Sequence, residues 1–151
     1  MIDASRIAYI GRHAGLLREI AHGVKDGSAK HADMAARLLD AALPPDCVIM
    51  PMPGHRGRAE AMLDVALRIS TISGRAVLDA LACVPHKSSY EQKARGVEPS
   101  PIAMLARFAV YGKVAIIDNC IASGATASAA LAVIPNASVY VLTISNWRKS
   151  K

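Results

Sequence analysis

Cysteine is scarce in this chain of 151 residues, and its three occurrences stand far apart. Cys47, Cys83 and Cys120 form no C-x-x-C pair, so the sequence lacks the four clustered ligands that a structural zinc site needs. An odd number of scattered thiols also argues against the disulfide framework of a small secreted domain. We therefore expect these cysteines to be reduced and buried.

Long hydrophobic runs are also missing, although 52% of the residues are hydrophobic. No segment approaches the roughly 20 consecutive apolar residues that cross a bilayer, and no secretory signal is evident at the N-terminus. We therefore expect a cytoplasmic protein without a membrane span. Aromatic residues make up only 4%, and the apolar content consists mainly of Ala, Val, Ile and Leu, which suits helices packed on a central sheet.

Acidic residues are in deficit, because 18 Lys and Arg stand against 12 Asp and Glu. The resulting net charge of +6 and pI of about 9.5 favour anionic partners such as nucleotides, sugar phosphates or nucleic acid. Composition does not choose among them, and a solvated basic surface without a partner is equally compatible with it. Two common phosphate-binding patterns, G-x-x-x-x-G-K-[ST] and G-x-G-x-x-G, are absent.

The first 45 residues predict a helical segment. One face of an amphipathic helix that ends near Gly27 is formed by Ile7, Ile10, Ala14, Leu17, Ala21 and Val24. Ser28 suits the N-cap of a second helix. The inward face of that helix would carry Ala32, Ala35, Leu39 and Ala42, and it would end at Pro44 and Pro45.

Residues 46–145 predict an α/β core. We expect strands at 47–50, 76–78, 114–117 and 139–144, and helices at 59–69 (ended by Gly74), 102–108 and 125–134. Between 84 and 101 lies a polar, proline-flanked stretch of the length that is usually functional or disordered. Alternating strands and helices imply parallel βαβ units with helices on both faces of the sheet. No linker or repeat divides the chain, so we expect a single domain over 1–151.

The clearest chemical signal is the segment that follows the predicted strand 114–117. Asp118 and Asn119 come at its carboxyl end, where ligands bind in open α/β sheets, and are suited to bind vicinal hydroxyls or a hydrated cation. Small residues then lead into a helix, and Gly124 allows the backbone to approach a ligand closely. Amide groups at such a helix start form an anion site. The alternative is an ordinary turn with Ser123 or Thr126 as the helix cap.

Residues 118–126 resemble the phosphoribosyl-pyrophosphate loop of type I phosphoribosyltransferases, in which apolar residues and an acidic pair precede a small phosphate cradle. Within that family the loop looks most like the ComF-type competence-associated members. Residues 48–58, proline-rich and basic, resemble the family's pyrophosphate loop, and residues 84–98 stand where its mobile catalytic loop lies. The resemblance covers about residues 46–145. It implies a parallel, Rossmann-like core that here carries two N-terminal helices and a reduced hood over the acceptor.

The resemblance also implies an activity: transfer of phosphoribose from phosphoribosyl pyrophosphate to a nitrogenous base, with release of pyrophosphate. The 5-phosphate would be held by Ala122, Ser123, Gly124, Ala125 and Thr126. The ribose would bind Asp118 and Asn119, and the pyrophosphate would face Pro53, Gly54, His55, Arg56 and Arg58. Catalysis would involve Asp118, Lys87 and Arg95. Magnesium (Mg²⁺) would bind through the substrate, with Asp118 as the possible direct ligand, and a homodimer is possible.

Several positions depart from the family pattern. Asn119 replaces a second acid, and Ala122 replaces the aspartate that hypoxanthine-type members use on the base, which disfavours oxopurine salvage through that residue. The ComF-type amino-terminal cysteine cluster is missing, so the helices before Pro44 or the tail with Trp147 must supply the hood. Two alternatives therefore stay open. One is a non-catalytic module that binds phosphoribosyl pyrophosphate or a nucleotide, or that serves a DNA-handling role, and the other is a plain nucleic-acid-binding domain.

Overall fold

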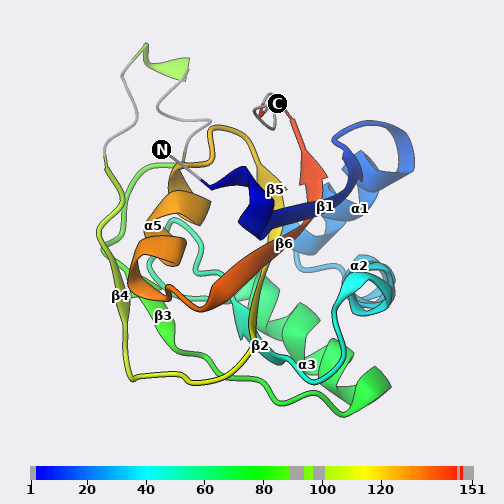
Figure 1. Cartoon of the computed structure of the whole chain (residues 1–151). Helices are drawn as coiled ribbons and strands as arrows, with labels where there is room; N and C mark the ends of the chain where they lie inside the picture. Colours follow the sequence, from blue (N-terminus) through cyan, green and yellow to red (C-terminus); the bar gives the residue numbers. More distant parts are fainter. Residues whose placement is uncertain (1–2, 89–93, 97–100, 146, 148–151) are drawn as a thin grey trace.

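A four-stranded parallel sheet forms the centre of the computed structural model, which describes residues 3–88, 94–96, 101–145 and 147. Its order is β1-β6-β5-β2 (Figure 1), and its strands are β1 (Ile7–Arg12), β2 (Val48–Pro51), β5 (Val114–Ile121) and β6 (Ala137–Ile144). A separate antiparallel pair joins β3 (Leu81–Cys83) to β4 (Met104–Ala106). The helical elements are η1 (Ala4–Arg6), α1 (Gly15–Lys25), α2 (Ala29–Ala42), α3 (Ala61–Ser73) and α5 (Ala125–Val133).

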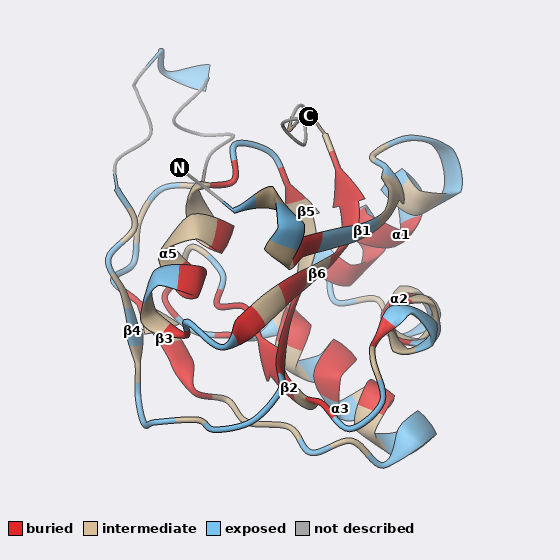
Figure 2. Cartoon of the chain, viewed as in Figure 1, coloured by how far each residue is buried: buried red, intermediate tan, exposed pale blue. Residues whose placement is uncertain are grey.

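Successive side chains of a strand point to opposite faces of the sheet. Both faces of this sheet are apolar, and helices cover each of them. In β5, Ala115 and Ile117 pack against α1, α2 and α3, whereas Val114 and Ile116 pack against α5 and the β3–β4 pair. The strands at the centre are accordingly buried (Figure 2). The parallel α/β core that the sequence predicts is confirmed.

The ends of two helices follow their capping residues. Ser28 accepts a hydrogen bond from the N–H of His31 and begins α2, as predicted. Gly74 adopts a left-handed conformation with φ of 75° and ends α3, also as predicted. Among the described residues, no helix combines the length and the apolar character needed to cross a membrane.

The predicted helix over residues 7–24 is wrong in its first half. Ile7–Arg12 is the edge strand β1, which pairs in parallel with β6, and α1 begins only at Gly15, whose φ is +56°. Ile7 is buried, whereas Ala8 and Tyr9 are exposed. The apolar residues at a spacing of three fit a helix face, but pairing with β6 decides the conformation. The N-terminal segment therefore contributes a strand as well as two helices.

Two shorter predictions also need correction. The helix expected over 102–108 is instead strand β4, which pairs with β3. The strand expected over 76–78 is reduced to one parallel bridge between Val77 and Ile49. In both places the hydrogen-bonding partner lies far along the chain, so the local pattern does not determine the conformation.

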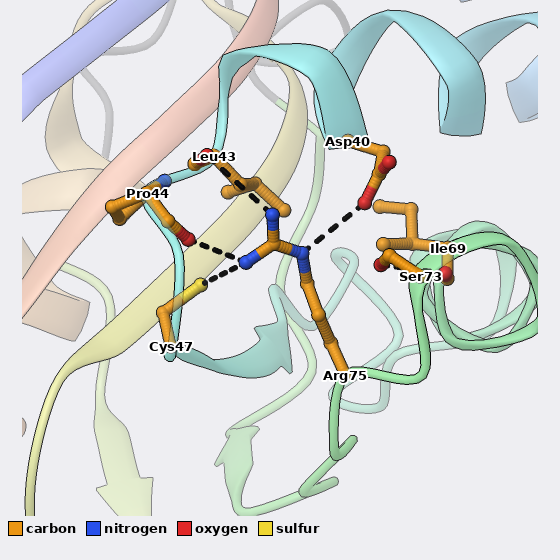
Figure 3. Close-up of polar contacts among 7 residues, drawn as sticks. All are labelled: Asp40, Leu43, Pro44, Cys47, Ile69, Ser73 and Arg75. Atoms are coloured by element: carbon orange, nitrogen blue, oxygen red, sulfur yellow. Dashed lines mark hydrogen bonds and ion pairs between the residues drawn. The ribbon is translucent and has the colours of Figure 1, made fainter.

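A polar cluster around Arg75 joins the helices just before β2 begins (Figure 3). The guanidinium donates to the Asp40 carboxylate with a Nε–Oδ1 distance of 3.1 Å. It also donates to the main-chain oxygens of Leu43 and Pro44 and contacts the Cys47 sulfur at 3.3 Å. These contacts connect the end of α2 to the residue that follows Gly74, and they satisfy carbonyls that the helix end leaves free.

Candidate functional site

The carboxyl end of β5 runs directly into the start of α5. β5 extends to Ile121, so Asp118 and Asn119 lie within the strand rather than after it as predicted. Ala122 and Ser123 are exposed, and Gly124 is buried at the N-cap of α5 with φ of 86°. That left-handed conformation favours glycine at this position.

The N-terminus of α5 has free amide groups. Gly124 offers no side chain as a cap, and the only cap-like contact is a 3.3 Å hydrogen bond from the Ala125 N–H to Ser123 Oγ. The N–H groups of Thr126 and Ala127 have no hydrogen-bond acceptor among the described residues. Thr126 is thus not the cap that the alternative interpretation requires. Free amides and the helix dipole together favour an anion here.

A pocket of about 320 Å³ opens at this junction. It is lined by His13, Ala21, His22, Lys25, Ser88 and residues 118–127. The structure thus brings together all seven residues that the sequence predicts on β5 and its following loop. The lining adds three residues of α1 and His13, which follows β1, and the sequence pattern does not predict these residues here.

The Asp118 carboxylate lies in a desolvated position. Burial raises its pKa to about 7, and the hydrogen bond from the Asn119 N–H to Oδ1, at 2.7 Å, offsets part of that increase. The carboxyl group therefore titrates near neutral pH in the ligand-free protein. A group so perturbed in a pocket is a candidate for function.

Asn119 has one amide atom paired and one unpaired. Its Nδ2 donates to the main-chain oxygen of Ala21 at 2.8 Å, which connects β5 to α1. Its Oδ1 is buried and has no hydrogen-bond partner among the described residues. Leaving a buried acceptor unpaired costs about 1–3 kcal/mol, so this oxygen is suited to a donor that arrives with a ligand.

His13 is connected to Asn119 through a buried threonine. The fully buried hydroxyl of Thr143 donates to the Asn119 main-chain oxygen at 3.2 Å and lies 3.0 Å from His13 Nδ1. Desolvation lowers the pKa of His13, and the nearby His22 and Arg18 lower it further. The centroids of the His13 and His22 rings are 5.2 Å apart. His13 is therefore mainly neutral at pH 7.

Cys120 differs from the other two cysteines. Cys47 and Cys83 are buried, as predicted, whereas Cys120 is only partly buried and lines the pocket. Burial raises the pKa of its thiol, an effect that contacts with Thr143 and Ser145 oppose. The thiol is therefore protonated at neutral pH and is not an activated nucleophile.

The predicted pyrophosphate loop lies beyond the end of β2, next to β5 at the same edge of the sheet. Gly57, with φ of +99°, accepts a hydrogen bond from the Cys83 N–H, and His55 accepts one from the His86 N–H at 2.8 Å. Arg56 and Arg58 are exposed. None of the predicted residues in this loop lines the pocket.

The structure does not bring the predicted catalytic cations into the pocket. Lys87 and Arg95 are exposed and do not line it, whereas the adjacent Ser88 does. The central part of the predicted catalytic loop, residues 89–93, lies outside the described residues. Trp147 is partly buried and packs with the core on the α5 side, so it fits a packing role better than a stacking platform for a base.

The sequence pattern does not predict His13, His22 and Lys25 as pocket residues, whereas Cys120 falls within the predicted loop segment. His13 and His22 form no local motif, and both fall within the single amphipathic helix that the sequence predicts. The break at Gly15 is the feature that separates them, since it leaves His13 before α1 and His22 on it. Within the described part of the chain, no group of three or more His, Cys, Asp or Glu side chains could hold a metal ion.

The parallel sheet and the helices that cover it have the type I phosphoribosyltransferase fold. The adenine phosphoribosyltransferase of Leishmania tarentolae matches with a TM-score of 0.54 and 12% identity over 96% of this chain and 94% of that one. The Leishmania donovani enzyme of the same description matches at 0.49 and 14%, over 80% and 67%. No family model and no curated protein matches the sequence. The predicted fold class is thus confirmed, whereas the ComF-type resemblance stays a prediction.

Proposed function

We propose that this protein binds phosphoribosyl pyrophosphate and transfers its phosphoribose to a nitrogenous base, releasing pyrophosphate. The observation that carries the proposal is the pairing of free amides at the start of α5 with an unpaired acceptor, Asn119 Oδ1, in one pocket. The amides favour an anion, and the acceptor favours a hydrogen-bond donor. A phosphorylated sugar supplies both groups in one molecule.

The 5-phosphate would bind the loop over residues 122–126. The N–H groups of Thr126 and Ala127 would donate to phosphate oxygens, and Gly124 would let the backbone approach closely. Lys25 on α1 would add positive charge at the rim of the pocket, and the His22 ring on the same helix could donate a hydrogen bond. Each of these contacts favours a dianion over a neutral ligand.

The ribose hydroxyls would bind Asp118 and Asn119. A carboxylate accepts hydrogen bonds from hydroxyl groups, and Asn119 Oδ1 needs one such donor. Hydrogen bonds to the ionised form lower the pKa of a carboxylate. Ribose binding would therefore move the Asp118 pKa down from about 7 and keep the group charged at neutral pH.

Magnesium fits this donor set only as a substrate-bound ion. Among the residues that the structure describes, Asp118 is the one carboxylate that lines the pocket, and Mg²⁺ commonly binds one or two protein carboxylates together with substrate phosphates and water. When bound, the ion would neutralise charge on the leaving pyrophosphate. Asp118 would hold it directly or through the ribose hydroxyls.

The pyrophosphate would face the loop over residues 53–58. This loop follows β2, whose end lies beside the end of β5, and it exposes Arg56 and Arg58. Lys87 and Arg95 are the further cations that we propose for charge stabilisation on the leaving group. The reaction needs no covalent bond between protein and substrate, so positioning and charge stabilisation would supply most of the catalysis.

Adenine is the first acceptor to test, because the Leishmania tarentolae structure that matches the fold is an adenine phosphoribosyltransferase. Ala122 has no side chain that could exchange a proton with a base, which argues against oxopurine chemistry through that position. A second function, ligand binding without catalysis, is favoured by the same alanine and by Asn119 in place of a second acid. Pyrophosphate release with a panel of bases separates the two.

The test of the binding site is ligand-dependent thermal stability. Phosphoribosyl pyrophosphate should raise the melting temperature, and more with magnesium than without, since a ligand at 100 times its dissociation constant adds about 2.7 kcal/mol. Gly124→Val should abolish the shift, because the new side chain fills the phosphate loop and opposes its φ of 86°.

Gly112→Val is the matched control. Gly112 has nearly the same backbone conformation, with φ of +85°, and is exposed outside the pocket, so this variant carries similar strain and should keep the ligand shift. The absence of any shift in the native chain at millimolar ligand would refute both functions. Salt-sensitive DNA binding that the ligand does not alter would instead favour a nucleic-acid-binding domain.

A further inference from the structure

The hydrogen bonds behind His13 favour one of the two neutral tautomers of its ring. The Thr143 hydroxyl has one hydrogen, and it donates that hydrogen to the Asn119 main-chain oxygen, which can only accept. In that arrangement the contact with His13 Nδ1 at 3.0 Å is made with the imidazole as the donor. Neutral His13 thus has its proton on Nδ1, which leaves the Nε2 lone pair available in a residue that lines the pocket.

The strand order places His13 on the side from which an acceptor must arrive. In the proposed function the ribose lies over the end of β5 and the pyrophosphate over the end of β2. A nucleophile that displaces a leaving group in line approaches from the opposite face, which here is the side of β6 and β1. His13 directly follows β1, and its N–H is hydrogen-bonded to the Ile144 oxygen at the end of β6.

We propose that His13 Nε2 is the catalytic base that takes the proton from the attacking nitrogen of the acceptor. This inference rests on the proposed function. It gives the reaction a proton acceptor that residue 122, an alanine, does not provide. It also narrows the acceptor class to ring nitrogens that carry a hydrogen before they attack.

The chemistry balances with the groups present. The bond between the anomeric carbon and the pyrophosphate oxygen breaks, and its electron pair leaves with the pyrophosphate. The acceptor nitrogen forms a bond to the same carbon and gives its hydrogen to His13 Nε2. The resulting imidazolium keeps its Nδ1–H on the Thr143 hydroxyl and later releases the second proton to water.

The surroundings of His13 favour a neutral ring before the reaction. His22 and Arg18 on α1 add positive charge near it, and both lower its pKa. From β5, the protonated thiol of Cys120 contacts Thr143, and Asp118 lines the same pocket. A base with a lowered pKa is unprotonated at neutral pH and holds its function to lower pH than an ordinary histidine.

The test is His13→Asn, which retains a side-chain N–H to donate to Thr143 and has no group that can accept a proton at neutral pH. With phosphoribosyl pyrophosphate, magnesium and adenine or another base from the panel, kcat should fall roughly 100- to 10,000-fold. KM for phosphoribosyl pyrophosphate and its thermal shift should remain near the native values. The acidic limb of the pH profile of kcat should disappear, because kcat reports the bound enzyme, in which the ribose keeps Asp118 ionised.

Two further measurements make the outcome decisive. Nitrogen-resolved NMR of the ligand-free protein should show His13 with its proton on Nδ1, and Thr143→Val should release that preference. His31→Asn, on α2 and outside the pocket, controls for loss of a histidine and should leave turnover unchanged.

The results separate this inference from the proposed function. Native turnover that persists in His13→Asn, or a proton found on Nε2, overturns the role of His13 and leaves the proposed function intact. Ligand binding without turnover in the native chain also overturns it and favours the non-catalytic module. A native chain that does not bind phosphoribosyl pyrophosphate refutes the proposed function and this inference together.

Discussion

Polar groups are paired at the amino edge of the parallel sheet, where its strands begin, and are left partly unpaired at the carboxyl edge, where the strands end. At the amino edge, the Arg75 guanidinium pairs with Asp40 and with the carbonyls that end α2 (Figure 3). At the carboxyl edge, Asp118 is desolvated with only one backbone N–H to offset the effect, and Asn119 Oδ1 has no partner among the described residues. The same chain thus satisfies one polar cluster and leaves the other incomplete.

We infer that the amino edge serves folding stability and the carboxyl edge serves ligand binding. Paired groups at the amino edge contribute to the stability of the ligand-free protein. Unpaired groups at the carboxyl edge lower that stability, and a ligand that pairs them recovers the difference as binding free energy. Substitutions at the two edges should therefore have opposite signs on stability, and only those at the carboxyl edge should alter ligand binding.

The largest effect on folding is expected for Arg75→Met. The change leaves the Asp40 carboxylate and the carbonyls of Leu43 and Pro44 without their donor in a mostly buried place. The free energy of unfolding should fall by about 2–3 kcal/mol, as measured by urea denaturation. The thermal shift produced by phosphoribosyl pyrophosphate should persist.

Arg68→Met provides the comparison. Arg68 pairs with Asp64 one turn away on α3, and the carboxylate side of that pair is half exposed. Surface pairs of this kind contribute less than about 1 kcal/mol. Equal losses for the two variants would show that the amino-edge cluster has no special role in stability, and the comparison of edges would then break down.

Asp118→Asn should stabilise the ligand-free protein at alkaline pH. Because the folded pKa is raised to about 7, the native carboxyl contributes its full stability below the unfolded pKa of about 4 and loses it as the pH rises toward 7. The variant does not ionise, so it should gain about 2 kcal/mol at pH 8 and under about 0.5 kcal/mol at pH 4. Its ligand shift should be lost.

Asp46→Asn is the control for this pH dependence. Asp46 is exposed, and its φ of 59° is one that Asn adopts readily, so its stability change should stay within about 0.5 kcal/mol at both pH values. A destabilised Asp118→Asn at pH 8 would mean that the carboxylate is well solvated or paired, and that the carboxyl edge is not strained.

The part of the fold that the sequence predicts well is the part with continuous local signals. β5, α5 and β6 appear as apolar runs separated by small residues and by Pro135. Their periodicity needs no knowledge of distant partners, because strands buried on both faces are apolar throughout. The anion loop is predicted for the same reason, since all its parts are contiguous.

The missed elements are those that distant partners determine. β1 carries apolar residues at a spacing that also fits a helix, and only its pairing with β6, near the other end of the chain, makes it a strand. β4 likewise depends on β3. Such short or edge strands have little intrinsic preference, so tertiary contacts override the local pattern.

The pocket residues likewise fall into two groups, those that the local sequence predicts and those that tertiary packing brings in. Asp118, Asn119 and the phosphate loop are found from one stretch of sequence, whereas His13 and Lys25 reach the pocket only because α1 packs against β5. The hydrogen bond from Asn119 Nδ2 to the Ala21 oxygen fixes that contact. No spacing within the sequence records it, so the half of the pocket opposite the loop could not be predicted.

The smallest effect, and the finest test of the comparison, is expected for Lys25→Gln. Lys25 is exposed on α1 at the rim of the pocket, so it should attract an anionic ligand through solvent without affecting folding. The dissociation constant of phosphoribosyl pyrophosphate should rise roughly threefold at low salt and less at high salt. Lys30→Gln, exposed on α2 outside the pocket, should leave affinity unchanged. Equal losses of affinity for both variants would assign the effect to the net charge of the protein. Lys25 would then make no local contribution to anion binding at the carboxyl edge.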